Sequence, residues 1–404
     1  MRFWLVGCEM GTMLTRRDFA KRGMMCAGAV LAGFEQVLWP PSVAGLQNRS
    51  NDPFLGGKQL GVMDFINPRP LEMDTEQGTE LDGRLYTDLS KVSLQEPVIA
   101  THRFYVRTRV TRLLPDVKSW RVRVDGLVEK PRNCTIEELR SAARPLGLHL
   151  MECAGNVPLT NFGMISVASW GGVPLADILE KSGVKSQASR VLVTGFDQYA
   201  TKSMTSVPGA SWVFSIGDLK TAGAFLATEM NGKPLAADHG APVRLVVPGW
   251  YGCACIKWVT EITFVDDTAE AASQMQEYAA RTHQKGVPTL ARDFQAATID
   301  QAAMPIRIEK WLVEEKIKYR VVGIAWGGHT PVKTLMIRFN PEEDYVPVDN
   351  FVQTKNDPWT PWTHAWSPKE PGTYSIRLAV KEPAVRTRRL DSGYYVRSVE
   401  ISEV

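Results

Sequence analysis

Alternating apolar and polar residues dominate the chain from about residue 104 onward and predict many short β-strands. Residues 120–124 (WRVRV) alternate in this way, and the Asp125-Gly126 pair that follows is typical of a hairpin turn. Residues 258–265 alternate too, whereas residues 190–194 and 243–247 are mostly apolar and predict buried strands.

Two segments carry helix signals instead. Thr135 stands where an N-cap is expected, and Glu137 and Glu138 would fall in the first turn of a helix that ends near Ala143. Residues 175–181 (LADILEK) predict a second short helix with one apolar face. The region 101–285 therefore mixes helices and strands.

The C-terminal region has a different pattern. Residues 285–305 show little periodicity and predict a connection. Four β-like runs then follow, separated by Gly, Pro, Asn and Asp, and their spacing predicts an antiparallel sandwich of immunoglobulin-like size over residues 305–404. These runs are residues 319–324, 333–339, 372–380 and 394–401.

The N-terminal region reads as a leader followed by an arm. Residues 15–21 (TRRDFAK) form a twin-arginine pattern ahead of an apolar stretch at about residues 24–38. We interpret residues 1–44 as a signal peptide cleaved near Ala44, the alternative being a chance Arg pair before a core helix. Residues 45–100 are rich in turn formers and predict an extended arm with little core.

This leader predicts export by the twin-arginine route to the periplasm, a route that carries folded proteins with a cofactor already inserted. The apolar stretch of the leader is too short for a membrane span, and no other segment is long and apolar enough to predict one. The length of 404 residues leaves room for two domains after the leader.

Charge and cysteine content narrow the function classes. The formal net charge of +3 gives no indication of nucleic-acid binding. The six cysteines include no CxxCH motif and no CxxC pair, which argues against covalent c-type haem and an iron–sulfur cluster. Cys153 is the most informative of them, because it follows an apolar segment and precedes Ala-Gly-Asn, a setting that exposes a thiolate. Such a thiolate serves as a nucleophile or a soft metal ligand, although a single cysteine is more often buried and inert.

Three motifs gain meaning when they are taken together with Cys153. They are CAGN at 153–156, DHGAPVR at 238–244 followed by VPGWYG at 247–252, and Lys-Trp at 257–258. In this order and spacing they resemble the sulfite oxidase family of molybdenum enzymes, from about residue 95 to the C-terminus. The resemblance implies an α+β fold, in which a mixed α/β molybdopterin-binding domain at 101–285 precedes an all-β immunoglobulin-like sandwich. The sandwich would resemble the dimerisation module of the family, so a homodimer is expected.

The resemblance also implies roles for individual residues. Cys153 would be the single protein ligand to a molybdenum ion that one pterin dithiolene also holds. Arg107 would bind an anionic substrate at the mouth of the site, and Tyr278 would hydrogen-bond the bound oxyanion, unless it only faces the core from an amphipathic helix. The cofactor would be bound by seven residues, which are Phe104, Arg107, Cys153, His239, Arg244, Gly252 and Lys257. Among them, Arg and Lys suit the pterin phosphate, and Gly249 and Gly252 would let the backbone approach the cofactor.

The sequence departs from the family at the substrate pocket. Val157 and Pro158 follow CAGN where the family usually has arginine, which removes positive charge, and Arg109 could restore some of it. The arginine-rich run at 386–389 reads as a solvated strand end, the alternative being that one arginine returns to the pocket. Cys253 and Cys255 read as two buried thiols, the alternatives being a second metal site or a strained disulfide.

These features predict a molybdenum-dependent oxidation of sulfite to sulfate. Because the chain encodes no haem, the electrons would pass to an external acceptor, such as a c-type cytochrome. One alternative is a reductase of an S-oxide or another oxyanion on the same molybdopterin site. Another is an exported binding protein that retains the fold without catalysis.

Overall fold

The computed structural model describes residues 52–66, 71–196, 210–349, 351–354, 356–391, 393 and 395–404. The predicted signal peptide at 1–44 lies outside these residues. Among the described residues, no helix has the length and apolar character needed to cross a bilayer.

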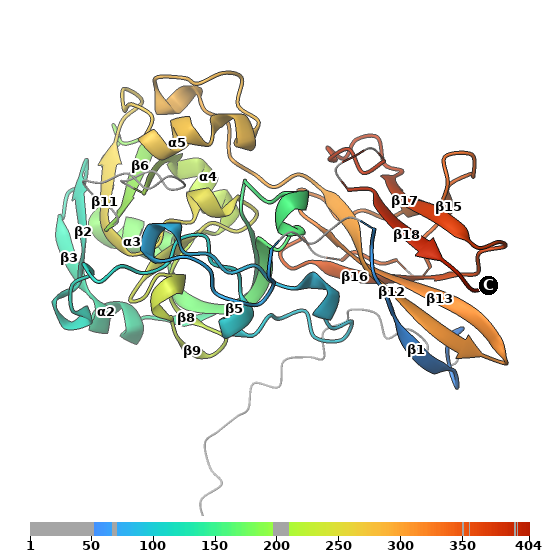
Figure 1. The fold of residues 1–404 in the computed structure, drawn as a ribbon. Coiled ribbons are helices and arrows are strands. Elements are labelled where there is room, and N and C mark those ends of the chain that lie inside the picture. The colour runs from blue at the N-terminus through green and yellow to red at the C-terminus, as the bar shows by residue number, and fades with distance from the viewer. Residues whose placement is uncertain are drawn as a thin grey trace, which may run out of the picture. The chain divides into compact units, whose positions relative to one another are not determined.

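The first half of the described chain contains two five-stranded sheets with short helices around them (Figure 1). One sheet has the order β3-β2-β11-β6-β7, and its β2 and β11 run parallel. The other has the order β10-β8-β5-β4, with β9 paired to β8. Their bounds are β2 Arg121–Gly126, β3 Arg132–Thr135, β4 Arg144–Glu152, β5 Ile165–Pro174, β6 Arg190–Gly195, β7 Ser211–Ser215, β8 Phe225–Met230, β9 Lys233–Pro234, β10 Arg244–Val246 and β11 Val259–Val265.

Local capping interactions explain where α2 begins and where α3 ends. In α2 (Ile136–Ser141) the hydroxyl of Thr135 accepts from the Glu138 amide, which confirms the expected N-cap, and the Glu138 carboxylate accepts from the Thr135 amide, which makes it a capping box. In α3 (Leu175–Ser182) the apolar face is buried, and Gly183 ends the helix at φ 62°. The other helices are α4 (Ile216–Ala222) and α5 (Ser273–Glu277), with short 3₁₀ turns that include η7 (Ala237–His239), η8 (Gly252–Ala254) and η9 (Ala279–Thr282).

The C-terminal region contains two four-stranded antiparallel sheets, with the orders β1-β12-β13-β16 and β15-β14-β17-β18. Three of the predicted runs fall on β13, β14 and β17, and the fourth falls on β18. Four strands of these sheets, β1, β12, β15 and β16, were not predicted. The bounds are β1 Lys58–Met63, β12 Ala302–Val313, β13 Lys316–Trp326, β14 Leu335–Arg338, β15 Val346–Pro347, β16 Thr360–Trp366, β17 Gly372–Val380 and β18 Arg397–Ile401. The immunoglobulin-like classification of this region stays a prediction.

The N-terminal arm is more closely integrated than its composition indicated. Its β1 strand pairs with β12 at the edge of a C-terminal sheet, as Figure 1 shows in blue and orange. Tyr86, Leu89, Val92 and Ile99 are each at most 5% exposed and belong to the core. The expectation of little core was wrong here, because these apolar side chains are scattered among turn formers and give no periodic signal.

Candidate active site

Cys153 lies directly after β4, where the chain turns away from the sheet. Its amide donates to the Met164 carbonyl (2.9 Å), and its carbonyl accepts from the Asn156 amide (3.0 Å). The Gly155 amide points at Sγ (3.4 Å). Burial raises the pKa of the Cys153 thiol, while the Gly155 amide, Arg107 and Arg281 act to lower it. Burial outweighs these groups, so the dry setting by itself favours the protonated thiol, although Arg107 and Arg281 add positive charge near the sulfur.

The structure brings all the predicted site residues together around one cavity. They come from four separate stretches of the chain, which the two sheets fold toward each other. The cavity lining includes Phe104, Arg107, Cys153, His239, Arg244, Gly252, Lys257 and Tyr278.

His239 and Arg244 form the buried wall of this cavity. The His239 Nε2 atom lies 2.9 Å from the Thr101 carbonyl and donates to it in the neutral tautomer, which leaves Nδ1 as an acceptor. Burial lowers the pKa of His239 to about 4. The Arg244 guanidinium donates to the carbonyls of His239 (3.1 Å) and Cys255 (3.0 Å). Arg244 is only 4% exposed, so a positive charge lies inside the protein among neutral partners.

Lys257 and Gly252 complete the floor. The Lys257 ammonium donates to the carbonyls of Thr108 and Asp238 and lies 4.3 Å from the centre of the Trp258 ring. A Cβ atom on Gly252 would lie 2.6 Å from the Tyr105 hydroxyl and 3.3 Å from the Glu152 carbonyl. The expected reason for Gly252, close approach of a cofactor, is therefore incomplete, because protein packing already requires glycine there.

Tyr278 lies at the C-cap of α5 and lines the cavity, so it does more than pack against the core. Burial raises the pKa of its phenol to about 12; Cys153 raises it further, whereas Arg107 and Arg281 act to lower it. The phenol is therefore protonated at neutral pH and can donate a hydrogen bond.

The residues present fit molybdopterin. The Arg244 Nε atom is buried and has no hydrogen-bond partner among the described residues. Burial also lowers the pKa of Arg244, which marks a charge that its surroundings do not fully compensate. An anionic group such as a phosphate would supply the missing acceptor and the opposite charge. Cys153 adds the soft ligand atom that molybdenum prefers.

Comparison with known proteins supports the same cofactor. The family model of the oxidoreductase molybdopterin binding domain matches residues 109–273. The chain is 30% identical to sulfite oxidase of Arabidopsis thaliana over 184 residues, which are 41% of this chain and 47% of that protein. It is 32% identical over 158 residues to the methionine-sulfoxide reductase catalytic subunit MsrP of Xanthomonas axonopodis pv. citri (strain 306), covering 38% of this chain and 47% of that protein.

Residues 109–273 are therefore a molybdopterin-binding oxidoreductase domain of the sulfite oxidase type.

The enzyme spans less than half the length of the curated relatives it matches, as the coverage of 47% for the plant sulfite oxidase shows. The sulfane dehydrogenase SoxCD of Paracoccus pantotrophus has a similar fold over more of the chain, with a TM-score of 0.62, 18% identity, and coverage of 87% of this chain and 99% of that one. At this identity the likeness concerns the fold alone.

Two arginines near Cys153 were not predicted as site residues. Arg281, on η9, has its Nη1 atom 3.4 Å from the position of a Cβ on Gly155, and its guanidinium lies 5.5 Å from the centre of the Tyr278 ring. Arg388 donates a two-pronged pair of hydrogen bonds to the carboxylate of Glu152, beside Cys153. The run at 386–389 is therefore no solvated strand end at Arg388.

Two other expectations concern the pocket, one about Arg109 and one about Cys253 and Cys255. Arg109 does not restore charge to it, because its guanidinium pairs with Glu76 (2.8 Å) and donates to the Gly78 carbonyl (3.2 Å). Cys253 and Cys255 are both buried and free, as expected, and both line the cavity. Arg281 carries no local motif, whereas Arg388 belongs to the arginine-rich run whose alternative interpretation sent one arginine back toward the pocket.

Proposed function

We propose that this enzyme oxidises a small anionic sulfur compound, with sulfite as the first candidate, and passes the electrons to an external acceptor. The observation that carries the proposal is the placement of Cys153 in a cavity with Arg107 and Tyr278, and with Arg281 close by. A soft ligand atom, two cations and a phenol donor suit an oxyanion that must lie near a metal.

In this proposal the buried wall and floor hold the cofactor, and the outer residues hold the substrate. Cys153 would ligate molybdenum, while His239, Arg244 and Lys257 would bind the phosphate and polar edge of the pterin. When bound, molybdopterin supplies two-electron redox chemistry coupled to the transfer of one oxygen atom. Sulfite would gain an oxygen atom that derives from water, and two electrons and two protons would leave.

The residues near the mouth of the cavity would interact with the charge of the substrate. Arg107, which lines the cavity, and Arg281, which lies close to it, would attract the dianion and balance its charge, since cations at a cleft of low dielectric concentrate anions in it. Tyr278 would donate from its protonated phenol to an oxygen of the substrate, because its raised pKa keeps the proton on at neutral pH.

A reductase of an S-oxide is the second candidate. It is favoured by Val157 and Pro158, which replace positive charge directly after CAGN, and by the similarity to MsrP, a methionine-sulfoxide reductase. A pocket with fewer cations would suit a neutral S-oxide better than a dianion. Arg281 weighs against this candidate, because it adds a cation from another element.

We also propose export to the periplasm, a c-type cytochrome as the electron acceptor, and a homodimer. The twin-arginine pattern at residues 15–21 supports export. Export in turn would place the enzyme in a compartment where an external haem protein can accept electrons one at a time. Cell fractionation with and without the Arg16-Arg17 pair would test the export step.

The decisive experiment is sulfite-dependent reduction of ferricyanide by protein from a host that makes molybdopterin, with molybdenum measured in the same sample. We expect turnover at micromolar sulfite and its loss in Cys153→Ser, because an alkoxide is a harder ligand than a thiolate. A fully loaded protein that leaves ferricyanide oxidised would refute sulfite as the substrate, and S-oxide reduction with a viologen donor would then be measured. Full turnover in Cys153→Ser would refute the ligand assignment.

A further inference from the structure

Glu152 is a buried carboxylate that stands next to the proposed metal ligand. It is 1% exposed and accepts from both terminal nitrogens of Arg388, at 2.8 and 2.7 Å. Its Oε2 atom also accepts from the Trp326 indole (2.9 Å), and its Oε1 atom from the Asn156 amide group (3.3 Å). The carboxylate is therefore held by three side chains, of which Trp326 and Arg388 come from distant parts of the chain.

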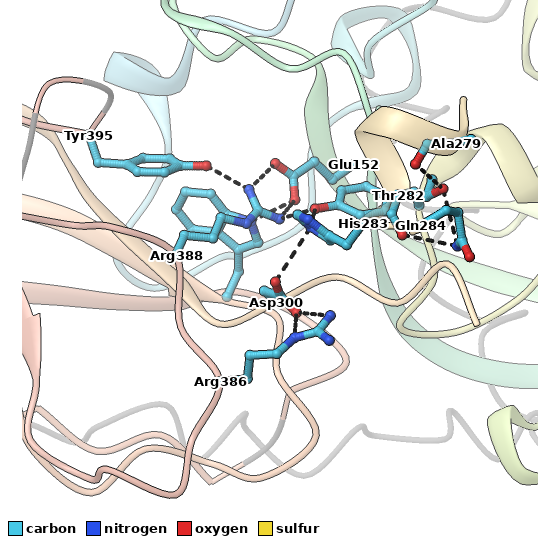
Figure 2. A network of polar contacts seen from close by, with 11 residues as sticks. Glu152, Ala279, Thr282, His283, Gln284, Asp300, Arg386, Arg388 and Tyr395 are labelled. Atoms are coloured by element: carbon cyan, nitrogen blue, oxygen red, sulfur yellow. Dashed lines mark hydrogen bonds and ion pairs between the residues drawn. The ribbon is translucent and has the colours of Figure 1, made fainter. Parts of the chain in front are cut away.

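Arg388 is also held in place by hydrogen bonds to residues other than Glu152. Figure 2 shows its guanidinium between Glu152 and Tyr395. Its Nη1 atom donates to the Tyr395 hydroxyl (2.8 Å) and its Nη2 atom to the Tyr251 hydroxyl (3.0 Å). Its backbone amide donates to the Gln301 carbonyl (3.0 Å), just before β12. The two-pronged pair that Arg388 forms with Glu152, called the fork below, therefore joins the segment between β17 and β18 to the end of β4.

The hydrogen bonds around Glu152 also extend to the loop that contains Cys153. Asn156, which donates to Glu152, also accepts from the Met164 amide (3.1 Å) through its side-chain oxygen. The Met164 carbonyl in turn accepts from the Cys153 amide (2.9 Å). The Asn156 end of the loop is thus tied directly to the Glu152 carboxylate, and the Cys153 end is tied to it through Met164 and Asn156.

A buried ion pair adds little net stability by itself, because desolvation of both charges offsets their attraction. Its directional hydrogen bonds nevertheless fix geometry, and a two-pronged arginine–carboxylate pair fixes it most tightly. Both terminal nitrogens of Arg388 are engaged by Glu152, Tyr251 and Tyr395, and Arg388 does not line the cavity, so its role differs from that of a substrate contact.

We propose that Glu152 and Arg388 are positioning residues, whose buried fork holds the Cys153 sulfur at a fixed place in the cavity and makes that place depend on the C-terminal sheets. This proposal rests on the assignment of Cys153 as the molybdenum ligand. Groups that orient a metal ligand without touching the metal commonly change activity about 10–100-fold when they are mutated.

The test compares Glu152→Gln with wild type in molybdenum-loaded protein. Gln keeps the shape but removes the charge and one accepting prong of the fork. We expect a shifted molybdenum(V) electron paramagnetic resonance signal and a kcat for sulfite that falls about 10–100-fold, with little change in KM. Arg388→Lys, which keeps the charge and loses the fork, should shift the same signal, and it replaces Glu152→Gln if that variant does not fold.

Glu309 provides a matched control away from the site. It is a buried carboxylate (6% exposed) that accepts from Arg307 (2.8 Å) and from the Trp311 indole (3.1 Å), as Glu152 does from Arg388 and Trp326. We expect Glu309→Gln to lower Tm but to leave the molybdenum signal and kcat unchanged.

The outcomes separate the two proposals. A wild-type signal and kcat in loaded Glu152→Gln, or in loaded Arg388→Lys, would overturn the positioning role, and so would equal changes in Glu309→Gln. Wild-type protein without molybdenum would instead overturn the cofactor assignment on which the role rests.

Discussion

At the residue scale, Arg281 is the side chain that most directly affects the choice of substrate. Its guanidinium lies near Gly155 and the Tyr278 ring, where it can meet an anion that approaches Cys153. We expect Arg281→Gln to raise the KM for sulfite about 10-fold with little change in kcat, because a solvent-accessible cation mainly concentrates the anion. Steady-state kinetics at low ionic strength measure this effect, and added salt should reduce the difference from wild type.

Arg109→Gln is the control for this prediction. Arg109 was the residue that the sequence indicated as a replacement for the missing arginine, but it is paired with Glu76. The KM of Arg109→Gln for sulfite should therefore equal that of wild type. An unchanged KM in Arg281→Gln would show that Arg281 does not attract the anion. An equal rise in Arg109→Gln would show that the effect does not depend on the place of Arg281 near Cys153.

His239 gives a prediction about pH at the same scale. Its pKa falls from 6.5 in the unfolded chain to about 4 in the folded protein, because burial disfavours the charged ring. The unfolded state then binds more protons between these values, so the contribution of His239 to stability is complete above pH 6.5 and is lost as the pH falls toward 4. We expect a loss of about 2–3 kcal/mol in the free energy of unfolding between pH 7 and pH 4.5 from this group.

Urea unfolding of wild type and His239→Gln at both pH values measures this contribution. Gln keeps a donor for the Thr101 carbonyl but does not titrate, so its stability should fall less on acidification. Other groups titrate equally in both proteins and cancel in the difference. Parallel losses in the two proteins would mean that His239 binds its proton equally in the folded and unfolded states.

At the element scale, the η8 turn must accept the Tyr105 side chain. A Cβ on residue 252 would lie 2.6 Å from the Tyr105 hydroxyl, so Gly252→Ala overpacks a buried turn that lines the cavity. We expect a loss of about 1–3 kcal/mol in the free energy of unfolding and reduced molybdenum content, measured by urea unfolding and metal analysis. Gly217→Ala in α4, whose Cβ would meet only Ser215 Oγ at 3.4 Å, should cost little.

Tyr105→Phe provides the complementary test. It removes the hydroxyl that the new Cβ would meet, so Gly252→Ala combined with Tyr105→Phe should recover much of the loss. Additive costs in the double variant would mean that the two atoms do not compete for the same space.

The elements also show what the sequence could predict. The N-cap at Thr135 and the strand predicted at residues 190–194 are local patterns, and both appear in the structure, the strand as β6 (Arg190–Gly195). Strand β16 was missed because Thr360–Trp366 mixes Pro, His and Trp, which hides its alternation although Trp362, His364 and Trp366 are buried. Strand β12 was missed because it begins at Ala302, inside the segment that was predicted to be a connection.

At the scale of the whole molecule, the predicted site residues lie in motifs whose spacing carries the information. The contact of Arg388 with Glu152 spans 236 positions, and although the arginine-rich run drew attention to Arg388, no local pattern identifies Glu152 as its partner. It arises only when the C-terminal sheets pack beside the end of β4. The same holds for Arg281, whose place near Gly155 depends on how η9 follows α5. Long-range contacts of this kind therefore decide the details of the site that the sequence left open.

Molybdopterin should also stabilise the whole molecule, because it would neutralise the buried charge of Arg244 and satisfy its Nε atom. A group that binds only the folded state at about 1,000 times its Kd adds about 4 kcal/mol, so we expect protein from molybdate-starved cells to lose roughly 5–10 °C in Tm. Calorimetry of starved and replete protein measures the difference. Arg244→Met removes the buried cation that the cofactor would neutralise, so cofactor loading should raise its Tm less. Equal Tm values for starved and replete wild-type protein, at confirmed molybdenum contents, would contradict a cofactor that binds through this buried wall.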